Sequence, residues 1–517
     1  MNHSDSHHLY ATLGAGRAIA CQDIPRLELT DFQRAMGVAM KRGWRVASLF
    51  AIQDALAPSA GNPLPAVQVV MADDATASLH LMQTTVRDSY PSMATEFPQV
   101  QLFEREMAEQ CGINLVGHPW LKPVRFAPPL YAGNGNTPIP KNQNTLCGQM
   151  NFYQVQGDEV HEVAVGPVHA GVIEPGHFRF QCHGEEIFNL EISLGYQHRG
   201  VERALIGGPD KRSLHYAETL AGDTTIGHTT AYCQILEALS HTQKSARAQT
   251  LRGIALELER LANHVGDLGA ISGDAGFLPT ASYCGRLRGE YLNMTALLCG
   301  NRFGRGLICP GGVAFDVDDS LISQLQNQLK IVGTQTRQAI NLLWNAPSVM
   351  ARLEETGVLD KQVVLDLGLV GPMARACGLP RDARQNHPTG LFRFAHIPTA
   401  TWESGDVFAR AYVRWLEIQR SLDFVSTQLR SLPPGNIFSP LGKLSPNQFA
   451  VSMVEGWRGE ICHVAQTDSH GRFMRYKAVD PSFHNWSAVG LALRGEEISD
   501  FPLCNKSFNL SYCGHDL

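Results

Sequence analysis

The chain has 517 residues, of which 44% are hydrophobic and 18% are charged, and its formal net charge is -6. This length predicts two or more domains with large cores. The negative charge argues against nucleic acid as a partner, because phosphate-binding proteins usually present a basic surface. No segment approaches 18 apolar residues, and the N-terminus lacks the regions of a signal peptide, so no transmembrane segment is predicted.

The 12 cysteines are scattered singly, and no two have the spacing C-x-x-C. Iron–sulfur and structural zinc sites usually show clustered cysteines. A disulfide framework is not expected either, because thiols stay reduced in a chain without a secretion signal. The pattern predicts buried, unreactive thiols and no metal bound by this chain.

The N-terminal part predicts a tail followed by a small α+β domain. Residues 1–26 form the predicted tail, and residues 27–126 form the domain, with a helix over 31–42 and strands over 67–71 and 77–82. Residues 127–150 are rich in Pro, Gly and Asn, which is typical of an extended linker. A domain boundary is predicted there.

Residues 151–517 predict a second, larger domain that is mostly helical. Apolar residues recur every three or four positions over 245–270 and again over 406–432, where Pro433 ends the pattern. A third long helix is predicted over 321–344, with a break near Gly333. The predicted fold class is α+β, with a helical bundle in the large domain and β segments at its edges.

Residues 97–126, FPQVQLFEREMAEQCGINLVGHPWLKPVRF, resemble the signature of the thirty-kilodalton subunit of complex I. The E-R-E core of that signature corresponds to Glu104-Arg105-Glu106. Its G-I and G-H-P elements correspond to residues 112–113 and 117–119.

The remainder resembles the forty-nine-kilodalton subunit of complex I and the large subunit of group 4 nickel–iron hydrogenases. The matching segments, in family order, are residues 165–180, 194–203, 256–269, 366–384, 405–420 and 475–486. The fusion of the two domains is like the large subunit of formate hydrogenlyase. The resemblance implies a subunit on the cytoplasmic side of the inner membrane. Its implied partners are a small iron–sulfur subunit, similar to the twenty-kilodalton subunit of complex I, and the membrane subunits of a complex I-like arm.

The resemblance also identifies positions where hydrogenases carry the four cysteines that bind nickel and iron. Those positions hold Ala221, Thr224, Ser511 and Gly514 in this chain. The metal pair requires soft, anionic thiolates, which none of these residues provides. A nickel–iron centre is therefore not expected, and iron–sulfur clusters are expected only in a partner.

Quinone is a possible ligand, because complex I uses the same cavity for its quinone. Of the three family residues that contact the quinone head, only the aspartate has a counterpart, Asp274. The tyrosine position holds Gly222, and residues 173–176 carry no histidine in register.

Further candidate catalytic residues come from the segment Glu174-Pro-Gly-His177-Phe-Arg179, which resembles the E-G-H-x-R region of hydrogenases. The resemblance implies that Glu174 transfers protons, with His177 and Arg179 beside it. The alternative interpretation is a Glu–Arg pair that holds the entry strand of the domain. His228 is retained from the N-terminal ligand motif and is also a candidate.

Three functional hypotheses follow. The first is a redox-complex subunit that couples electron transfer to an ion-translocating membrane arm without a nickel–iron centre. The second is a non-catalytic scaffold that docks an iron–sulfur subunit to a membrane module. The third is an active hydrogenase, which would require nickel.

Overall fold

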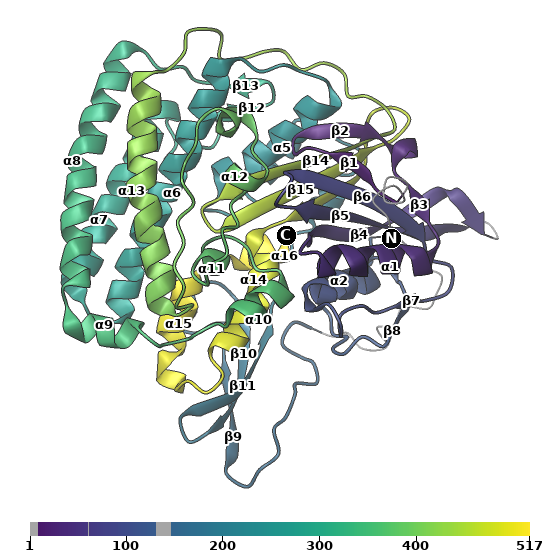
Figure 1. Cartoon of the computed structure of the whole chain (residues 1–517), viewed down its shortest axis with the longest axis horizontal. Coiled ribbons are helices and arrows are strands. Elements are labelled where there is room, and N and C mark those ends of the chain that lie inside the picture. Colours follow the sequence, from purple (N-terminus) through teal and green to yellow (C-terminus); the bar gives the residue numbers. More distant parts are fainter. Residues whose placement is uncertain (1–8, 60–61, 131–145) are drawn as a thin grey trace.

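A bundle of long helices and an N-terminal β-sheet domain lie on opposite sides of a central sheet (Figure 1). The computed structural model describes residues 9–59, 62–130 and 146–517. The predicted α+β class is confirmed. Most of the predicted linker, residues 131–145, lies outside the described residues.

The N-terminal domain is built on a five-stranded sheet in the order β1-β6-β5-β4, with β3 parallel to β6. Its strands are β1 (Ala11–Leu13), β3 (Arg26–Leu27), β4 (Arg45–Ser59), β5 (Asn62–Asp73) and β6 (Ser78–Thr85). Helices α1 (Leu29–Lys41) and α2 (Gln101–Cys111) pack against it, and β7 (Tyr90–Pro91) pairs with β8 (Leu115–Val116). The helix and both strands predicted for this domain are present.

The predicted N-terminal tail contributes two strands to the fold. Strand β1 pairs with β6, and β2 (Arg17–Ala20) pairs with β14 (Gln448–Gly456) of the large domain. Strands of three and four residues are too short for a periodic pattern to reveal them. The first domain therefore begins earlier than predicted, and its first strands join both parts of the chain.

The central sheet has the order β16-β15-β14-β2 and is buried on both faces. Strand β15 spans Gly459–Thr467 and β16 spans Phe473–Val479. Phe449 and Val451 pack into the N-terminal core, whereas Ala450 and Val454 pack into the helical core. This sheet lies at the edge of the helical bundle, where the sequence predicts β segments, but strands buried on both faces lack the alternation that marks a half-exposed sheet.

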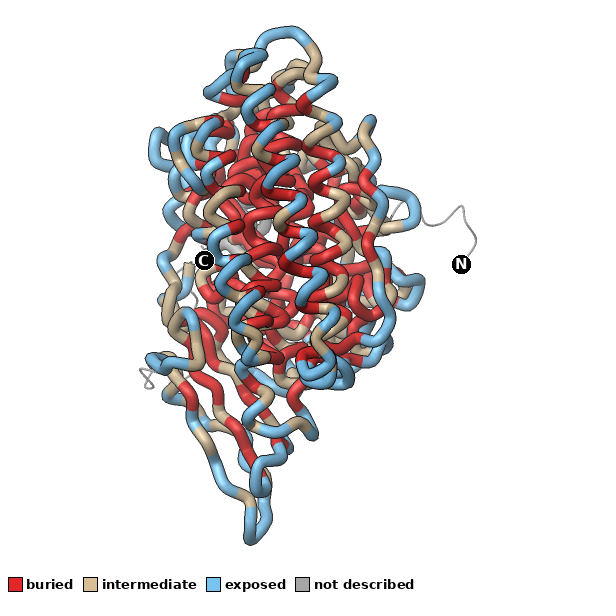
Figure 2. Tube along the Cα trace, turned by 90° about the vertical axis from the view of Figure 1, so that its left-hand side faces the viewer, coloured by how far each residue is buried: buried red, intermediate tan, exposed pale blue. Residues whose placement is uncertain are grey.

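Four long helices form the bundle: α6 (Ala246–Asp274), α7 (Leu278–Cys299), α8 (Asp319–Trp344) and α13 (Val407–Arg430). The outer faces of α7 and α8 are exposed and the sides that face the other helices are buried (Figure 2). Ser245 and Asp406 cap the N-termini of α6 and α13 by accepting backbone hydrogen bonds. Helix α5 (Thr225–Leu239) lies between α6 and the central sheet.

Helix α8 is continuous, so the predicted break near Gly333 is wrong. A Cβ atom at Gly333 would lie 3.3 Å from two side-chain carbons of Leu422 on α13. The glycine thus allows α8 and α13 to approach closely, and packing offsets its low helix propensity of about 1 kcal/mol. Glu257 and Arg260 of α6 are likewise buried, because other elements surround this helix.

The remaining elements surround the junction of bundle and central sheet. A separate sheet has the order β11-β10-β9 and projects from the body of the molecule (Figure 1). Its strands are β9 (Val160–Val165), β10 (His177–His183) and β11 (Glu186–Ser193). Three further helices belong to the C-terminal part: α14 (Pro481–Ala492), α15 (Phe501–Phe508) and α16 (Tyr512–Asp516). The shorter elements are α3 (Val201–Leu205), α4 (Ser213–Glu218), β12 (Ile308–Cys309), β13 (Gly312–Val313), α9 (Pro347–Leu353), α10 (Lys361–Leu367), α11 (Pro372–Arg375), α12 (Ala383–Asn386) and η4 (Gly390–Arg393). Within the described ranges, no helix combines the length and the apolar character needed to cross a bilayer.

Candidate functional site

The two segments that would carry the metal ligands in a hydrogenase lie against each other, although they come from distant parts of the sequence. The backbone of Gly222, in the loop before α5, hydrogen-bonds to the sulfur of Cys513 on α16. Arg458, in the turn between β14 and β15, contacts both segments. Its Nη1 lies 3.3 Å from Thr224 Oγ1, and its Nε donates to the carbonyl oxygen of Asn509 at 2.6 Å. The fold therefore brings the four predicted positions to one place.

The side chains at these positions do not fit a nickel–iron centre. Ala221 and Gly514 offer no side-chain donor atom. The hydroxyl of Thr224 accepts from Trp457 Nε1 at 3.1 Å, and the hydroxyl of Ser511 accepts from the backbone of Gly514 at 2.9 Å. Among the described residues, no group of three or more His, Cys, Asp and Glu side chains could hold a metal ion.

Gly514 and its neighbour Cys513 show why this site cannot accept a thiolate cluster. A Cβ atom at Gly514 would lie 2.6 Å from the carboxyl carbon of Asp480, so the Asp480 carboxylate fills the space of a side chain. Burial raises the pKa of the Cys513 thiol, and the neighbouring Glu174 raises it further. Cys513 is also a single thiol, which cannot replace the four thiolates that hold a nickel–iron pair.

A buried chain of hydrogen bonds begins at the same carboxylate. His228 Nε2 lies 2.9 Å from Asp480 Oδ2, and His228 Nδ1 lies 3.0 Å from His463 Nε2. The chain continues from His463 Nδ1 to the hydroxyl of Tyr476 at 2.7 Å. All four side chains are buried. Strands β15 and β16 supply His463 and Tyr476, and Tyr476 packs into the helical core beside Tyr232 of α5.

The charges along this chain follow from burial and from the hydrogen bonds. Burial alone would raise the pKa of Asp480, but its hydrogen bond with His228 holds this pKa below the usual value. Burial holds the pKa of His463 well below its usual value, and the nearby His228 lowers it further. His463 is thus neutral, and the chain provides a continuous hydrogen-bonded connection between Asp480 and Tyr476.

Glu174 lies beside this cluster, against the start of α16. Its Oε2 accepts a hydrogen bond from the backbone of Cys513 at 3.2 Å. Burial raises the pKa of its carboxyl, and the charge of Arg458 partly opposes that rise. Glu174 is thus a half-buried carboxylate whose pKa lies above the ordinary value and that can donate or accept a proton.

His177 and Arg179 do not contact Glu174 through any hydrogen bond or ion pair found among the described residues. Arg179 Nε donates to His177 Nε2 at 3.1 Å, and its Nη1 forms an ion pair with Glu162 of β9. The Arg179 guanidinium also lies 4.5 Å from the ring centroid of Phe152. The two residues belong to β10 and face β9, so the structure separates them from Glu174. The arginine near Glu174 is Arg458 instead.

No hydrogen bond or ion pair found in the described part of the chain joins Asp274 to this cluster. Asp274 is the last residue of α6 and is exposed. Partial burial raises the pKa of its carboxyl, and Lys506 of α15 opposes that rise. The structure therefore brings Glu174 and His228 together with the four substituted ligand positions, and it places His177, Arg179 and Asp274 elsewhere.

Comparison with known proteins agrees with this architecture. The profile described as "Respiratory-chain NADH dehydrogenase, 30 Kd subunit" matches residues 46–141, and that of the 49 Kd subunit matches residues 274–449. Carbon monoxide-induced hydrogenase of Rhodospirillum rubrum is 30% identical over 353 residues, which cover 68% of this chain and 97% of that protein. The chain belongs to the family of these complex I and hydrogenase subunits.

Two further relatives of this complex I and hydrogenase family show the breadth of the match. Formate hydrogenlyase subunit 5 of Escherichia coli K12 is 29% identical over 445 residues, covering 82% of this chain and 76% of the relative. Membrane-bound hydrogenase subunit alpha of Pyrococcus furiosus is 28% identical over 365 residues, covering 67% of this chain and 85% of the relative. The predicted resemblance, including the fusion of the two complex I-like domains, is confirmed.

Four residues of the site were not identified from the sequence: Arg458, Asp480, His463 and Glu259. Glu259 of α6 accepts from the backbone N–H groups of Ile226 and Gly227, at 2.7 and 3.2 Å. In the sequence, Asp480 before a proline has the pattern of a helix cap, and it does cap α14. His463 lies within a continuous buried strand, which carries no local signal of function. Only the meeting of distant segments reveals these residues.

Proposed function

We propose that this chain is a subunit of the peripheral arm of a membrane-bound oxidoreductase complex that works without a nickel–iron centre. The complex is related to NADH-quinone oxidoreductase and to energy-converting hydrogenases. Family membership and the relative named as membrane-bound support this role. The observation that carries the proposal is the Asp480 carboxylate, which lies 2.6 Å from the Cβ position of Gly514. A carboxylate and its histidine partner stand where a metal-binding thiolate would be needed.

In this proposal the chain docks a small iron–sulfur subunit, similar to the twenty-kilodalton subunit of complex I, and the membrane subunits of a complex I-like arm. It lies on the cytoplasmic side of the inner membrane. Electrons reach the site from clusters in the partner, and a quinone accepts them. Glu174 and the Asp480–His228 pair are the groups of this chain that can supply or take up the accompanying protons.

Elemental analysis and electron transfer, measured on the purified complex, test this proposal. We expect iron from the partner's clusters, far less than one nickel per chain, and reduction of a short-chain quinone by the reduced complex. Stoichiometric nickel together with hydrogen uptake would overturn the proposal in favour of an active hydrogenase. Zero electron transfer to any quinone, with normal reduction of the clusters, would overturn the redox role.

The second candidate function is a non-catalytic scaffold. The observation that favours it is the mutual pairing of charges at the site, where Asp223 and Arg458 form an ion pair and His228 pairs with Asp480. Such pairing is also typical of purely structural networks. Under this alternative, the complex would assemble and its clusters would be reduced, but substitutions of Glu174 would leave its function unchanged.

A further inference from the structure

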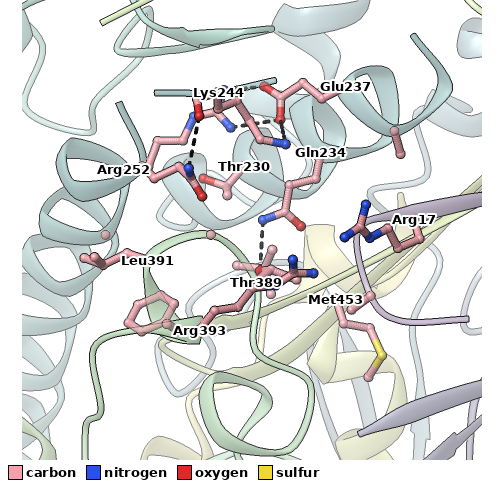
Figure 3. A pocket seen from close by; sticks show the side chains of 18 of the residues that line it. Arg17, Thr230, Gln234, Glu237, Lys244, Arg252, Thr389, Leu391, Arg393 and Met453 are labelled. Carbon is pink, nitrogen blue, oxygen red and sulfur yellow. Dashed lines mark hydrogen bonds and ion pairs between the residues drawn. The ribbon is translucent and has the colours of Figure 1, made fainter. Parts of the chain in front are cut away.

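A pocket of about 370 Å³ lies on the other side of α5, where the N-terminal strand β2 meets the large domain (Figure 3). Helices α5 and α6, strand β14 and residues 389–394 form its other walls. A pocket of this size is typical of sites for small ligands. It shares none of its lining residues with the Glu174 and Asp480 site.

The lining of this pocket carries an excess of positive charge. Its cationic side chains are Arg17, Lys244, Arg252, Arg384 and Arg393, and its carboxylates are Glu237 and Glu455. Both carboxylates already have partners. Glu237 pairs with Arg252 at 2.6 Å and with Lys244 at 3.1 Å, and Glu455 accepts from Arg375 Nη1 at 2.7 Å. Arg384 pairs with Asp382 at 2.7 Å and with Glu257 at 3.0 Å, so two lining arginines remain without a carboxylate partner in the described part of the chain.

Arg17 and Arg393 are those unneutralised arginines. Among the residues that the structure describes, neither forms an ion pair, and Arg393 donates only to the carbonyl oxygen of Pro388, at 3.2 Å. Partial burial lowers the pKa of Arg393, and the charge of Arg17 lowers it further. Both side chains lie at the same end of the pocket (Figure 3). Two adjacent guanidinium groups without a carboxylate repel each other unless an anion binds between them.

A polar group at the wall gives independent evidence for a ligand. Thr230 of α5 is only 3% exposed, and in the described structure its hydroxyl has no hydrogen-bond partner. Buried hydroxyls normally have one, so an unpaired hydroxyl facing a pocket indicates a missing polar contact. Gln234 is held beside it, because its Nε2 donates to Thr389 at 3.0 Å and its Oε1 accepts from Ser452 at 2.7 Å. The second N–H of this amide is a further donor for an anion.

We propose that this pocket binds a small organic phosphate, with the phosphate group between Arg17 and Arg393. Two guanidinium groups match the charge and the oxygen geometry of a phosphate monoester, which carries nearly two negative charges at neutral pH. Leu256, Leu391 and Met453 also line the pocket and provide apolar contacts for the organic part. Because β2 and η4 both contribute, binding would hold the N-terminal strand against the large domain.

Calorimetric titration of the full chain with phenyl phosphate tests this proposal. We expect saturable binding at one site, with inorganic phosphate weaker because it leaves the apolar wall uncovered. Arg17→Gln and Arg393→Gln should each weaken the affinity at least about tenfold, since each removes a charge-assisted contact. Thr230→Val should weaken it about threefold or more.

Arg430→Gln is the matched control, because Arg430 is also exposed and bonds only to the carbonyl oxygen of Ser426. Its affinity for phenyl phosphate should equal that of the unchanged chain. Should a glutamine variant fail to fold, Arg17→Lys and Arg393→Lys keep the charge and remove the paired donors. An absence of saturable binding, equal affinity for benzoate, or affinities that the arginine substitutions leave unchanged would each overturn the proposal.

Discussion

The guanidinium of Arg458 forms two parallel contacts with the carboxylate of Asp223, Nη1–Oδ1 at 2.5 Å and Nη2–Oδ2 at 2.8 Å. Arg458 belongs to the hairpin of the central sheet, and Asp223 lies between two of the substituted ligand positions. The same arginine donates to the carbonyl oxygen of Asn509, just before α16. In hydrogenases a shared metal pair would hold the two segments together. Here an arginine connects them.

Asp223→Asn is expected to destabilise the chain, because it leaves Arg458 without its charged partner. The Arg458 side chain is 3% exposed and that of Asp223 is 32% exposed, so water screens the pair only in part. We expect the free energy of unfolding to fall by about 1–3 kcal/mol, less than for a fully buried pair. Chemical denaturation measures this change.

Asp210→Asn is the control for that measurement. Asp210 also pairs with an arginine, Arg212, but side chains at 45% and 73% exposure leave that pair in water. Its loss should lower the free energy of unfolding much less than Asp223→Asn does, because water screens this pair. Equal effects of the two substitutions would contradict a structural role for the Arg458–Asp223 pair.

Gly514→Ala tests whether a carboxylate fills the space of the former ligand. The new methyl group would lie 2.6–2.9 Å from the carboxyl atoms of Asp480, which are fixed by His228 and by the start of α14. We expect a loss of about 2–3 kcal/mol in the free energy of unfolding, since overpacking forces these groups apart.

Gly222→Ala is the matched substitution in the facing segment. No heavy atom outside its chain neighbours lies within 4 Å of a Cβ atom built at Gly222, so its effect should stay within about 0.5 kcal/mol. If Gly514→Ala were tolerated equally well, the site would have room for a side chain, and the argument against a thiolate there would fail.

The parts of the fold that the sequence predicted are those with long periodic patterns or family motifs. Helices α6 and α13 were predictable because their apolar residues recur regularly and capping residues precede them. The central sheet was not predictable, because its strands are buried on both faces. Their sequences show no alternation that would distinguish them from other apolar segments. The break expected at Gly333 shows a related limit. A single residue does not reveal whether a glycine ends a helix or allows Leu422 to pack against it.

The residues of the site were likewise only partly predictable from the sequence. Family motifs located Glu174, His228 and the substituted ligand positions, which the fold does bring together. They also pointed to His177 and Arg179, whose orientation depends on the pairing of β10 with β9. Arg458 comes from a hairpin turn with no motif of its own. Its role depends on its contact with Asp223, which belongs to a segment far away in the sequence.

Glu259 should make the stability of the chain fall as pH rises. Burial raises the pKa of its carboxyl to about 8, although hydrogen bonds from Ile226 and Gly227 oppose the rise. The unfolded chain releases this proton near pH 4.5, the ordinary value. The folded chain therefore holds one proton more between about pH 5 and 8, and the free energy of unfolding should fall there by up to about 1.4 kcal/mol per pH unit.

Glu259→Gln removes this titration and keeps one of the two side-chain oxygens that accept backbone hydrogen bonds. Denaturation curves at several pH values should show a shallower decrease for the variant between pH 5 and 8. Below the unfolded pKa, the contribution of Glu259 is fully present, so the two proteins should differ least in acid. Parallel pH profiles for both proteins would contradict the raised pKa.

Glu174→Gln separates the two functional candidates. The amide can still accept the hydrogen bond from Cys513, so folding and assembly of the complex should be unaffected, but it cannot carry a proton. If Glu174 exchanges protons during quinone reduction, turnover of the assembled complex should fall about 100-fold or more. The measurement is quinone reduction by the purified complex, with assembly checked by gel filtration.

Glu162→Gln provides the control, because Glu162 is also a carboxylate paired with an arginine and lies on the adjacent β9. Glu162 and its partner Arg179 are both partly exposed. Loss of this ion pair should leave turnover unchanged. A selective defect at Glu174 would show that this half-buried carboxylate near Arg458 acts in the reaction. Unchanged turnover in both variants would instead leave Glu174 a packing contact of α16. The Asp480–His228 pair would then be the remaining candidate for proton exchange.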